Sequence, residues 1–265
     1  MKKFAIFGNP ISHSKSPQMH NSGFDFLNFD AKYFKILLED GKNLKTAFLE
    51  YNLSGANITV PHKEIAFLQA DEVRGIAKQI KAVNTYILED QKIVAYNTDA
   101  PGFLKAIESF GEIDNVLILG AGGTAKAISC GLVNNGKNVT VTNRSVEKLP
   151  FFQDIGCTIG SYEEIENSKF DLIVNTTSAG LKHDDLPAPE YLIENLLKNT
   201  KYVFDCIYGK LTPFLSIAQK LGVKYKDGED MLLYQGVLAF ELFCNIEASI
   251  ELIDAMRNGL KKVSA

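Results

Sequence analysis

The 265-residue sequence contains no tryptophan, only three arginines and only four cysteines. The cysteines, Cys130, Cys157, Cys206 and Cys244, lie far apart and form no Cys-x-x-Cys pair, so zinc-ligand spacing and a disulfide framework are both absent. We therefore expect reduced thiols in the core and no bound metal. Arginine is the residue best suited to bidentate phosphate recognition, and its scarcity makes the place of each arginine informative.

Long apolar runs and strong net charge are absent as well. No segment approaches the run of about 20 apolar residues that a membrane-spanning helix needs. A formal net charge of −4 gives the chain no reason to bind nucleic acid or anionic membranes. The start, Met1-Lys2-Lys3, is basic, but the apolar run Phe4–Phe7 is too short for a signal-peptide core. We expect a cytoplasmic protein without nucleic-acid or membrane partners.

Short apolar runs alternate with helical patterns almost throughout, which predicts an α/β fold with largely parallel sheets. Strands are expected at residues 4–8, 33–38, 56–60, 83–88 and 93–96, and then at 115–119, 139–142, 172–174, 203–207 and 223–225. Helices are expected near Pro17, over 44–51, from Pro61 and over 101–110. The chain after Met231 is expected to be helical to Leu260, with a break near Asn245. A change of composition near Asp99 suggests a domain boundary.

A glycine cluster follows the buried-looking strand 115–119. Its sequence, Gly120-Ala121-Gly122-Gly123-Thr124-Ala125, fits G-x-G-x-x-G/A between a strand and a helix, which is the context of a dinucleotide-binding turn. Gly120 would permit the tight turn, Gly122 would let backbone N–H groups approach a pyrophosphate, and Ala125 would allow close packing of helix against strand. The helix N-terminus would then attract the anion.

The end of the next strand predicts which nicotinamide cofactor binds. NAD enzymes usually carry an acidic residue there for the ribose 2′-hydroxyl. Here the strand runs into Asn143-Arg144-Ser145, with an arginine that can bond a 2′-phosphate and a serine hydroxyl that adds a donor. NADP is therefore favoured. The segment 175–180 also follows a strand, and either lines the cofactor cleft or forms an ordinary polar turn.

Other polar clusters lie in the first hundred residues. Ser14 and Ser16 precede a predicted helix, where they either cap it or bind a carboxylate. Asn57 and Thr59 face the same side of a strand. Lys63 follows at a helix N-terminus, where the helix dipole disfavours positive charge. Asp99 either caps the next helix or pairs with Lys63 and binds a substrate hydroxyl.

These clusters together resemble the shikimate dehydrogenase family over essentially the whole chain. The segments that carry the resemblance are Ser14/Ser16, 55–63, Ala82-Val83-Asn84-Thr85, Asn97-Thr98-Asp99, 120–125, 143–145, 175–180, Asp205 to Tyr208 with Thr212-Pro213, and Asp227-Gly228 through Met231 to Gln235-Gly236. Two departures stand out. Ser145 replaces the family's usual threonine, and no tryptophan follows Gln235.

The resemblance implies the fold and the activity. It implies an N-terminal α/β substrate domain, 1–100 plus 237–265, completed by the C-terminal helices that pack back on it. A Rossmann-type, doubly wound NADP-binding domain, 101–236, would be inserted between the two parts. The implied reaction is the reversible, NADPH-dependent reduction of 3-dehydroshikimate to shikimate, in aromatic amino acid biosynthesis, by a monomer or homodimer.

The resemblance also implies roles for single residues. Lys63 and Asp99 would form the catalytic pair, with Lys63 as a charged donor to the ketone oxygen. The substrate carboxylate would bind Ser14 and Ser16, with help from Tyr208. The ring hydroxyls would be held by Asn57, Thr59, Asn84, Asp99 and Gln235, and the cofactor would contact residues 120–125, Asn143, Arg144, Ser145, Thr176, Ser178 and Met231.

Two alternatives remain open. A quinate/shikimate dehydrogenase with relaxed cofactor use would share most of these motifs, although Arg144 and the two serines argue against it. A non-catalytic NADPH-binding sensor would keep the fold but would need neither Lys63 nor Asp99.

Overall fold

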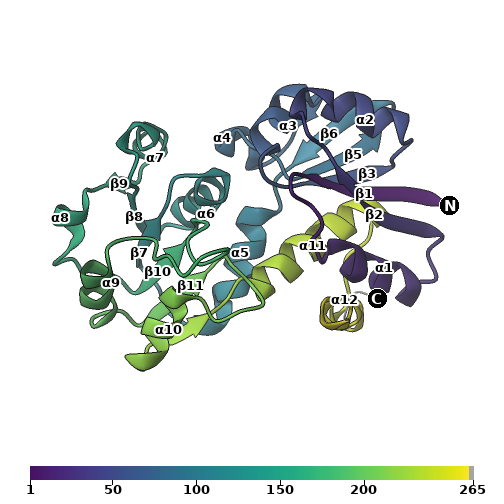
Figure 1. Cartoon of the computed structure of the whole chain (residues 1–265). Coiled ribbons are helices and arrows are strands. Elements are labelled where there is room, and N and C mark those ends of the chain that lie inside the picture. The colour runs from purple at the N-terminus through teal and green to yellow at the C-terminus, as the bar shows by residue number, and fades with distance from the viewer. Residues whose placement is uncertain (263–265) are drawn as a thin grey trace. The chain divides into compact units, whose positions relative to one another are not determined.

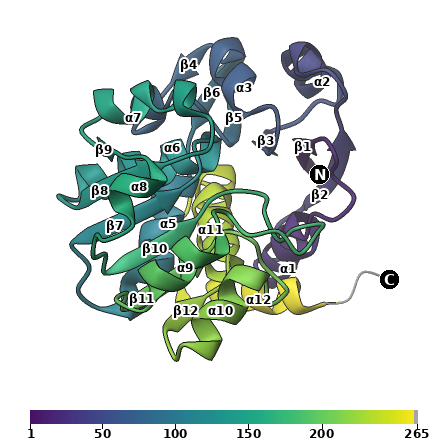
Figure 2. The same ribbon diagram turned by 60° about the vertical axis from the view of Figure 1, so that its left-hand side comes forward.

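The computed structural model describes residues 1–262 and divides the chain into two compact units. The first unit comprises Met1–Gly102 together with the chain from Leu233 onward, and the second comprises Phe103–Leu232. The boundaries fall within two helices, α5 (Asp99–Ile107) and α11 (Glu229–Cys244). Each unit is built on its own six-stranded sheet (Figures 1 and 2).

The sheet of the first unit is mixed. Its strands, in the order β2-β1-β3-β5-β6-β4, are β2 (Ala31–Leu37), β1 (Lys2–Gly8), β3 (Gly55–Ile58), β5 (Thr85–Glu89), β6 (Lys92–Tyr96) and β4 (Glu72–Val73). β1 is parallel to β2 and β3, whereas β5 runs antiparallel to β3 and β6. Asp90 and Gln91 make the tight turn between β5 and β6 with φ of 45° and 62°, so the strands predicted at 83–88 and 93–96 pair as a hairpin.

Helices cover both faces of this sheet (Figure 1). One face packs on α2 (Leu44–Glu50), α3 (Lys63–Gln69) and α4 (Ala77–Ile80), with Phe48 and Tyr86 meeting edge to face. The other face packs on α1 (Ser16–Phe26) and the part of α11 after Leu233, and α12 (Ile250–Lys261) packs on α1. A Cβ at Gly259 would lie 2.6 Å from the Gln18 carbonyl oxygen, so α12 approaches α1 closely. The predicted return of the C-terminal helices is confirmed.

The second unit has a fully parallel sheet with the order β12-β11-β10-β7-β8-β9 (Figure 2). The strands are β7 (Asn115–Leu119), β8 (Asn138–Thr142), β9 (Thr158–Ile159), β10 (Leu172–Asn175), β11 (Tyr202–Asp205) and β12 (Lys224–Lys226). The helices are α6 (Gly123–Asn134), α7 (Pro150–Asp154), α8 (Tyr162–Ile165), α9 (Glu190–Leu197) and α10 (Pro213–Lys220). This is the strand order of a doubly wound sheet: from β7 the chain adds strands first on the β8 side and then on the β10 side. Ligands of such sheets bind at the switch point, which here lies between β7 and β10.

Local patterns predict the long elements well and the short ones poorly. Every predicted strand has a counterpart, and the break after α11 falls at Asn245, where φ is 52°. The helix expected from Pro61 begins at Lys63 instead, and the one expected from Pro101 begins at Asp99. Two-residue strands such as β4 carry too little periodicity to be detected.

The cysteines only partly meet the expectation of core thiols. All four are free, but only Cys130 and Cys157 are buried, whereas Cys206 and Cys244 are half-buried. Burial raises the pKa of Cys130 to about 12 and that of Cys157 to about 11, so both remain thiols. Within residues 1–262, none of the helices has the length and apolar character needed to cross a membrane.

His20 is an unusual buried residue of the first unit. Its ring is 0% exposed and stacks on Tyr33 with centroids 4.3 Å apart, with Phe240 and Phe243 beyond. Neither ring nitrogen has a hydrogen-bond partner within the described part of the chain. Burial lowers the pKa of His20 to about 3, because a charged imidazolium could not be solvated there.

This burial predicts acid sensitivity. The unfolded chain protonates His20 below pH 6.5, whereas the folded chain resists protonation down to about pH 3. The free energy of unfolding should therefore fall as pH drops from 6.5, by about 1.4 kcal/mol per pH unit from this one group. We expect His20→Phe, which keeps a stacking ring, to lose less stability than wild type between pH 7 and pH 5 in urea titrations followed by circular dichroism. An equal loss in both proteins would contradict this prediction.

Candidate active site

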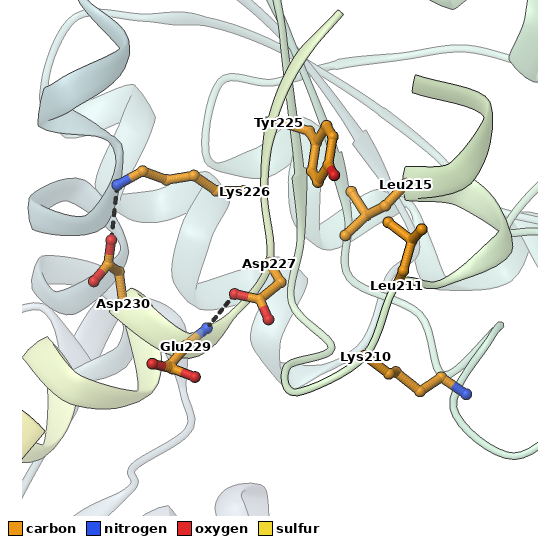
Figure 3. A pocket seen from close by; sticks show the side chains of 8 residues that line it. All are labelled: Lys210, Leu211, Leu215, Tyr225, Lys226, Asp227, Glu229 and Asp230. Carbon is orange, nitrogen blue, oxygen red and sulfur yellow. Dashed lines mark hydrogen bonds and ion pairs between the residues drawn. The ribbon is translucent and has the colours of Figure 1, made fainter. Parts of the chain in front are cut away.

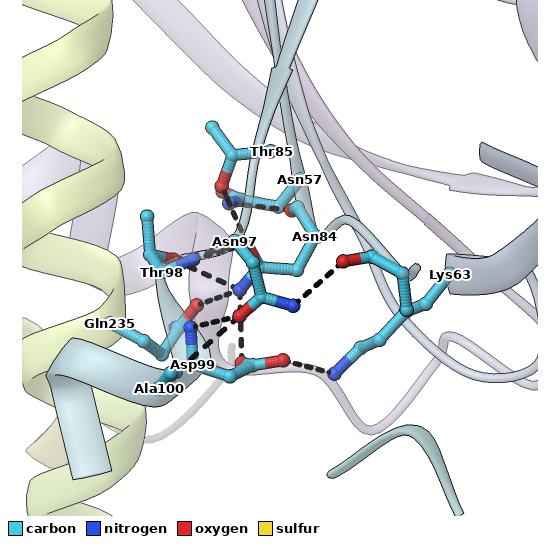
Figure 4. A network of polar contacts seen from close by, with 10 residues as sticks. Asn57, Lys63, Asn84, Thr85, Asn97, Thr98, Asp99, Ala100 and Gln235 are labelled. Atoms are coloured by element: carbon cyan, nitrogen blue, oxygen red, sulfur yellow. Dashed lines mark hydrogen bonds and ion pairs between the residues drawn. The ribbon is translucent and has the colours of Figure 1, made fainter. Parts of the chain in front are cut away.

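An ion pair between two helix starts forms the centre of a polar cluster in the first unit (Figure 4). The Lys63 Nζ donates to Asp99 Oδ2 at 2.7 Å, and the two side chains are only 15% and 8% exposed. Lys63 is the first residue of α3 and Asp99 the first of α5. The dipole of α5 stabilises the carboxylate, while that of α3 opposes the ammonium, so the aspartate compensates for a poorly placed lysine. The expected pairing of these two residues is present.

Asn84 connects this ion pair to the sheet. Its Nδ2 donates to Asp99 Oδ1 and to Thr98 Oγ1, both at 2.9 Å, and to Gln235 Oε1 at 3.4 Å. Its Oδ1 accepts from Thr98 N at 2.8 Å and from Thr85 Oγ1 at 3.0 Å. Asp99 thus has one oxygen toward Lys63 and the other held by Asn84, which fixes the plane of its carboxylate.

A residue other than Asp99 caps the first turn of α5. Asn97 Oδ1 accepts from Asp99 N at 3.0 Å and from Ala100 N at 3.4 Å, and Asn97 Nδ2 donates to Ala82 O at 3.0 Å. Asn97 therefore satisfies the first amides of the helix. The Asp99 carboxylate takes no part in that cap and faces Lys63 and Asn84, so the second of the two alternatives for Asp99 describes its contacts.

The remaining polar residues of the first unit surround this cluster at different depths. Asn57 is buried, and its Nδ2 donates to Asn84 O at 3.2 Å and to Thr85 Oγ1 at 3.1 Å. Thr59 is half-buried one residue beyond β3. Ser14 and Ser16 are buried at the start of α1, where Ser14 Oγ accepts from Ser16 N at 3.3 Å. Accepting that bond leaves the Ser14 hydroxyl hydrogen available as a donor, so capping and carboxylate binding are compatible.

This arrangement can hold a polyhydroxylated ring and stabilise negative charge on one of its oxygens. Asp99, Asn84 and Gln235 supply acceptors and amide donors, and the ammonium of Lys63 supplies a charged donor held in a fixed position. Charge-assisted hydrogen bonds in such a partly buried site are shorter and stronger than neutral ones.

In the second unit the glycine turn has the predicted geometry. Gly120 adopts a φ of 115°, and a Cβ there would lie 2.6 Å from Thr176 Oγ1, so no other residue fits without strain. A Cβ at Gly122 would meet nothing within 4 Å, which leaves an open approach to the first turn of α6. Ala125 is fully buried against the sheet. Free amides at this helix start suit a pyrophosphate.

Arg144 lies just beyond β8 and is exposed, while Ser145 and Asn143 beside it are half-buried. Asn143 Nδ2 donates to Ser145 O at 3.0 Å, which shapes the turn that carries the arginine. Thr176 is held next to the glycine turn, because its Oγ1 donates to Leu119 O at 2.8 Å. Ser178 is exposed and Met231 is buried. The donor set of this edge fits a dinucleotide with an added phosphate.

Asp205, at the end of β11, organises the same sheet edge. It is fully buried, and its carboxylate accepts from Asn175 Nδ2 at 3.1 Å, Ile207 N at 3.0 Å and Thr212 Oγ1 at 2.6 Å. Burial raises the pKa of Asp205, while these hydrogen bonds oppose the rise. The carboxylate therefore ties the end of β10, the loop with Tyr208 and the N-cap of α10 together.

A hollow of about 440 Å³ lies between the Lys210 loop and the start of α11 (Figure 3). Asp227 spans its rim: Oδ2 accepts from Gly209 N at 3.0 Å and Oδ1 accepts from Glu229 N at 3.1 Å. A Cβ at Gly228 would lie 2.4 Å from Cys206 O, so the neighbouring position requires glycine. The Asp-Gly pair thus joins the turn after Tyr208 to the helix that carries Met231.

Comparison with known proteins identifies the family of the chain. Residues 6–86 match the family model described as the shikimate dehydrogenase substrate binding domain. The chain is 49% identical over 244 residues to the NADP⁺ shikimate dehydrogenase of Helicobacter hepaticus, covering 91% of this chain and 90% of that protein. The chain belongs to the shikimate dehydrogenase family.

Solved structures of shikimate dehydrogenases have the same fold. The enzyme of Aquifex aeolicus is 34% identical, with a TM-score of 0.89, and the match covers 99% of this chain and 98% of the Aquifex chain. The Thermus thermophilus enzyme in complex with NADP(H) and shikimate is 31% identical, with a TM-score of 0.86. The match covers 98% of this chain and 99% of the Thermus chain. The expected two-domain α/β fold of a shikimate dehydrogenase is confirmed.

Thr85, Asn97 and Thr98 lie within the sequence motifs, which imply no role for them. The structure places all three in the hydrogen-bond network around Asn84 and Asp99. For Tyr33 the sequence predicts only the start of a strand, whereas its hydroxyl donates to Asn57 in the structure. The available signal was weak: polar residues at the ends of otherwise apolar strands.

The contacts of Asp205 predict a large stability effect. Asp205→Ala leaves three buried donors without an acceptor, and we expect it to lower the free energy of unfolding by about 2–4 kcal/mol. Asp205→Asn should cost less, because one oxygen can still accept. Asp184→Ala, at an exposed position of the same unit, serves as the control. Urea unfolding followed by circular dichroism measures all three, and a wild-type midpoint for Asp205→Ala would contradict the assigned role.

Proposed function

We propose that this protein catalyses the reversible reduction of 3-dehydroshikimate to shikimate with NADPH; its relatives are named NADP⁺ shikimate dehydrogenases. The observation that carries the proposal is the partly buried Lys63–Asp99 pair, whose carboxylate is held by Asn84, in a chain that also carries a dinucleotide-type glycine turn. A sensor that only binds NADPH would need no such pair. We further propose that the enzyme works in the cytoplasm.

The first unit would bind the substrate and the second the cofactor. In the second unit the turn Gly120–Ala125 would receive the pyrophosphate, and Arg144 with Ser145 and Asn143 would receive the 2′-phosphate. Thr176, Ser178 and Met231 would line the remainder of that site. Ser14 and Ser16 would donate to the substrate carboxylate, with help from Tyr208. The ring hydroxyls would be held by Asn57, Thr59, Asn84, Asp99 and Gln235.

The chemistry divides between cofactor and protein. In the reducing direction the ketone carbon gains a hydride and the ketone oxygen gains a proton. When bound, NADPH supplies the hydride. Lys63 stabilises the growing negative charge on the oxygen and donates the proton from Nζ. Asp99 keeps the ammonium in place through the 2.7 Å contact between its Oδ2 and Lys63 Nζ. Its Oδ1 accepts from Asn84, which would orient the carboxylate toward a ring hydroxyl.

An absorbance assay at 340 nm tests the function directly. We expect fast reduction of NADP⁺ with shikimate, and much slower reduction with NAD⁺ or with quinate, because Arg144 favours the 2′-phosphate and the two serines fit the smaller substrate. Comparable rates with NAD⁺ or quinate would instead identify a relaxed quinate/shikimate dehydrogenase. Folded protein that binds NADPH but reduces neither cofactor would sink the proposal and favour the sensor.

Lys63→Ala tests the catalytic pair. We expect turnover to fall by about 10²–10⁴-fold with little change in KM, because acid catalysis is lost while the ring contacts remain. Lys63→Met, which keeps most of the side-chain volume, should behave alike if the smaller variant folds poorly. Lys45→Ala is the matched control, since Lys45 pairs with Asp71 on the surface of the same unit. A Lys63→Ala enzyme with wild-type turnover would refute the assignment.

A further inference from the structure

Tyr33 is a buried phenol at one end of the polar network. It lies on β2, is 1% exposed, and its hydroxyl donates to Asn57 Oδ1 at 2.7 Å. Burial raises the pKa of Tyr33 well above its ordinary value, so the hydroxyl keeps its hydrogen. Because this buried hydroxyl donates its hydrogen bond to a side chain rather than to the backbone, it helps to set the orientation of that side chain.

The side chain that Tyr33 contacts is the one whose orientation matters. An amide has an accepting oxygen and a donating nitrogen of similar shape, so only its partners decide which way it points. Asn57 Nδ2 faces two acceptors, Asn84 O at 3.2 Å and Thr85 Oγ1 at 3.1 Å, while Oδ1 faces Tyr33. One lone pair of Oδ1 remains for a ligand hydroxyl, and its direction depends on the bond from Tyr33.

Tyr33 is itself held rigidly. Its ring stacks on that of His20 with an interplanar angle of 6°. Its backbone is held by Asn21 of α1, because Tyr33 N donates to Asn21 Oδ1 and Asn21 Nδ2 donates to Tyr33 O, both at 2.9 Å. β2 is an edge strand, so this pair of bonds fastens α1 to the free edge. The phenol is therefore a fixed reference for Asn57 rather than a mobile neighbour.

We propose that Tyr33 is a positioning residue for substrate binding, which fixes the amide of Asn57 so that its oxygen accepts from a substrate ring hydroxyl. The inference rests on the function proposed above. Hydrogen bonds continue from Asn57 through Thr85 and Asn84 to Asp99, which pairs with Lys63. Tyr33 and Lys63 thus occupy opposite ends of one network. Loss of the Tyr33 hydroxyl affects the hydroxyl-binding end and spares the proton donor.

Tyr33→Phe tests this division, because it removes the hydroxyl and keeps the ring that stacks on His20. We expect KM for shikimate to rise about three- to tenfold, as for the loss of one hydrogen bond. The kcat and the KM for NADP⁺ should stay within about twofold. Tyr86→Phe is the matched control: Tyr86 is also fully buried in the first unit, but its hydroxyl donates to the Ala66 carbonyl. It should lose stability without a change in KM.

A double-mutant cycle separates positioning from general destabilisation. If Tyr33 acts through Asn57, Tyr33→Phe should have no further effect on KM in an Asn57→Ala background. An unchanged KM for Tyr33→Phe, or an equal rise with and without Asn57, would overturn the inference. If Tyr33→Phe does not fold, Thr85→Val carries the expectation of a raised KM alone, because it removes one of the two acceptors of Asn57 Nδ2 and also a donor to Asn84 Oδ1. An unchanged KM for Thr85→Val would then overturn the inference. Wild-type protein inactive on shikimate would overturn the proposed function instead.

Discussion

The amide of Asn84 is the contact on which the polar site of the first unit depends. It lies where β5 begins and reaches the backbone and hydroxyl of Thr98, the carboxylate of Asp99 and the side chain of Gln235. An apolar residue there would leave the Thr98 amide and one oxygen of Asp99 without partners in a buried place, at a cost of about 1–3 kcal/mol for each group. Asn84 therefore fixes the carboxylate of Asp99, the partner of Lys63, while Asn97 caps the first amides of α5.

A buried polar cluster of this kind contributes little to the free energy of unfolding. Buried polar and charged groups stabilise a fold less than well-packed apolar ones of the same volume, and they tolerate no missing partner. The rest of the same sheet is packed with apolar side chains, such as Phe48, Ile58 and Tyr86 against α2 and α3. The concentration of amides, hydroxyls and one ion pair where β3 and β6 end and β5 begins is thus a feature of ligand chemistry, consistent with membership of the shikimate dehydrogenase family.

The second unit solves a different problem with backbone geometry. In its parallel sheet the order in which strands are added switches sides between β7 and β10. Because these two strands are neighbours, the turn after β7 must pass close to the turn after β10. Gly120 makes that passage possible, since any Cβ would strike Thr176. Asp205 then ties the neighbouring loops to the ends of β10 and β11 by accepting from three separate segments. One buried carboxylate thereby holds the loops at this edge of the sheet together.

The sequence by itself determined what local pattern controls: the apolar strands such as 116–119, the glycine turn at Gly120–Ala125, the arginine after β8 and the break at Asn245. Each depends on residues within a few positions of one another. Tertiary structure decided which polar groups meet. Tyr33 and Asn57 face each other because β2 and β3 both pair with β1, with Tyr33 opposite Phe4 and Asn57 opposite Ile6. Asn97 rather than Asp99 caps α5 because Asp99 is drawn to Lys63, 36 residues earlier. Such partnerships follow from strand register and packing, which no local periodicity encodes.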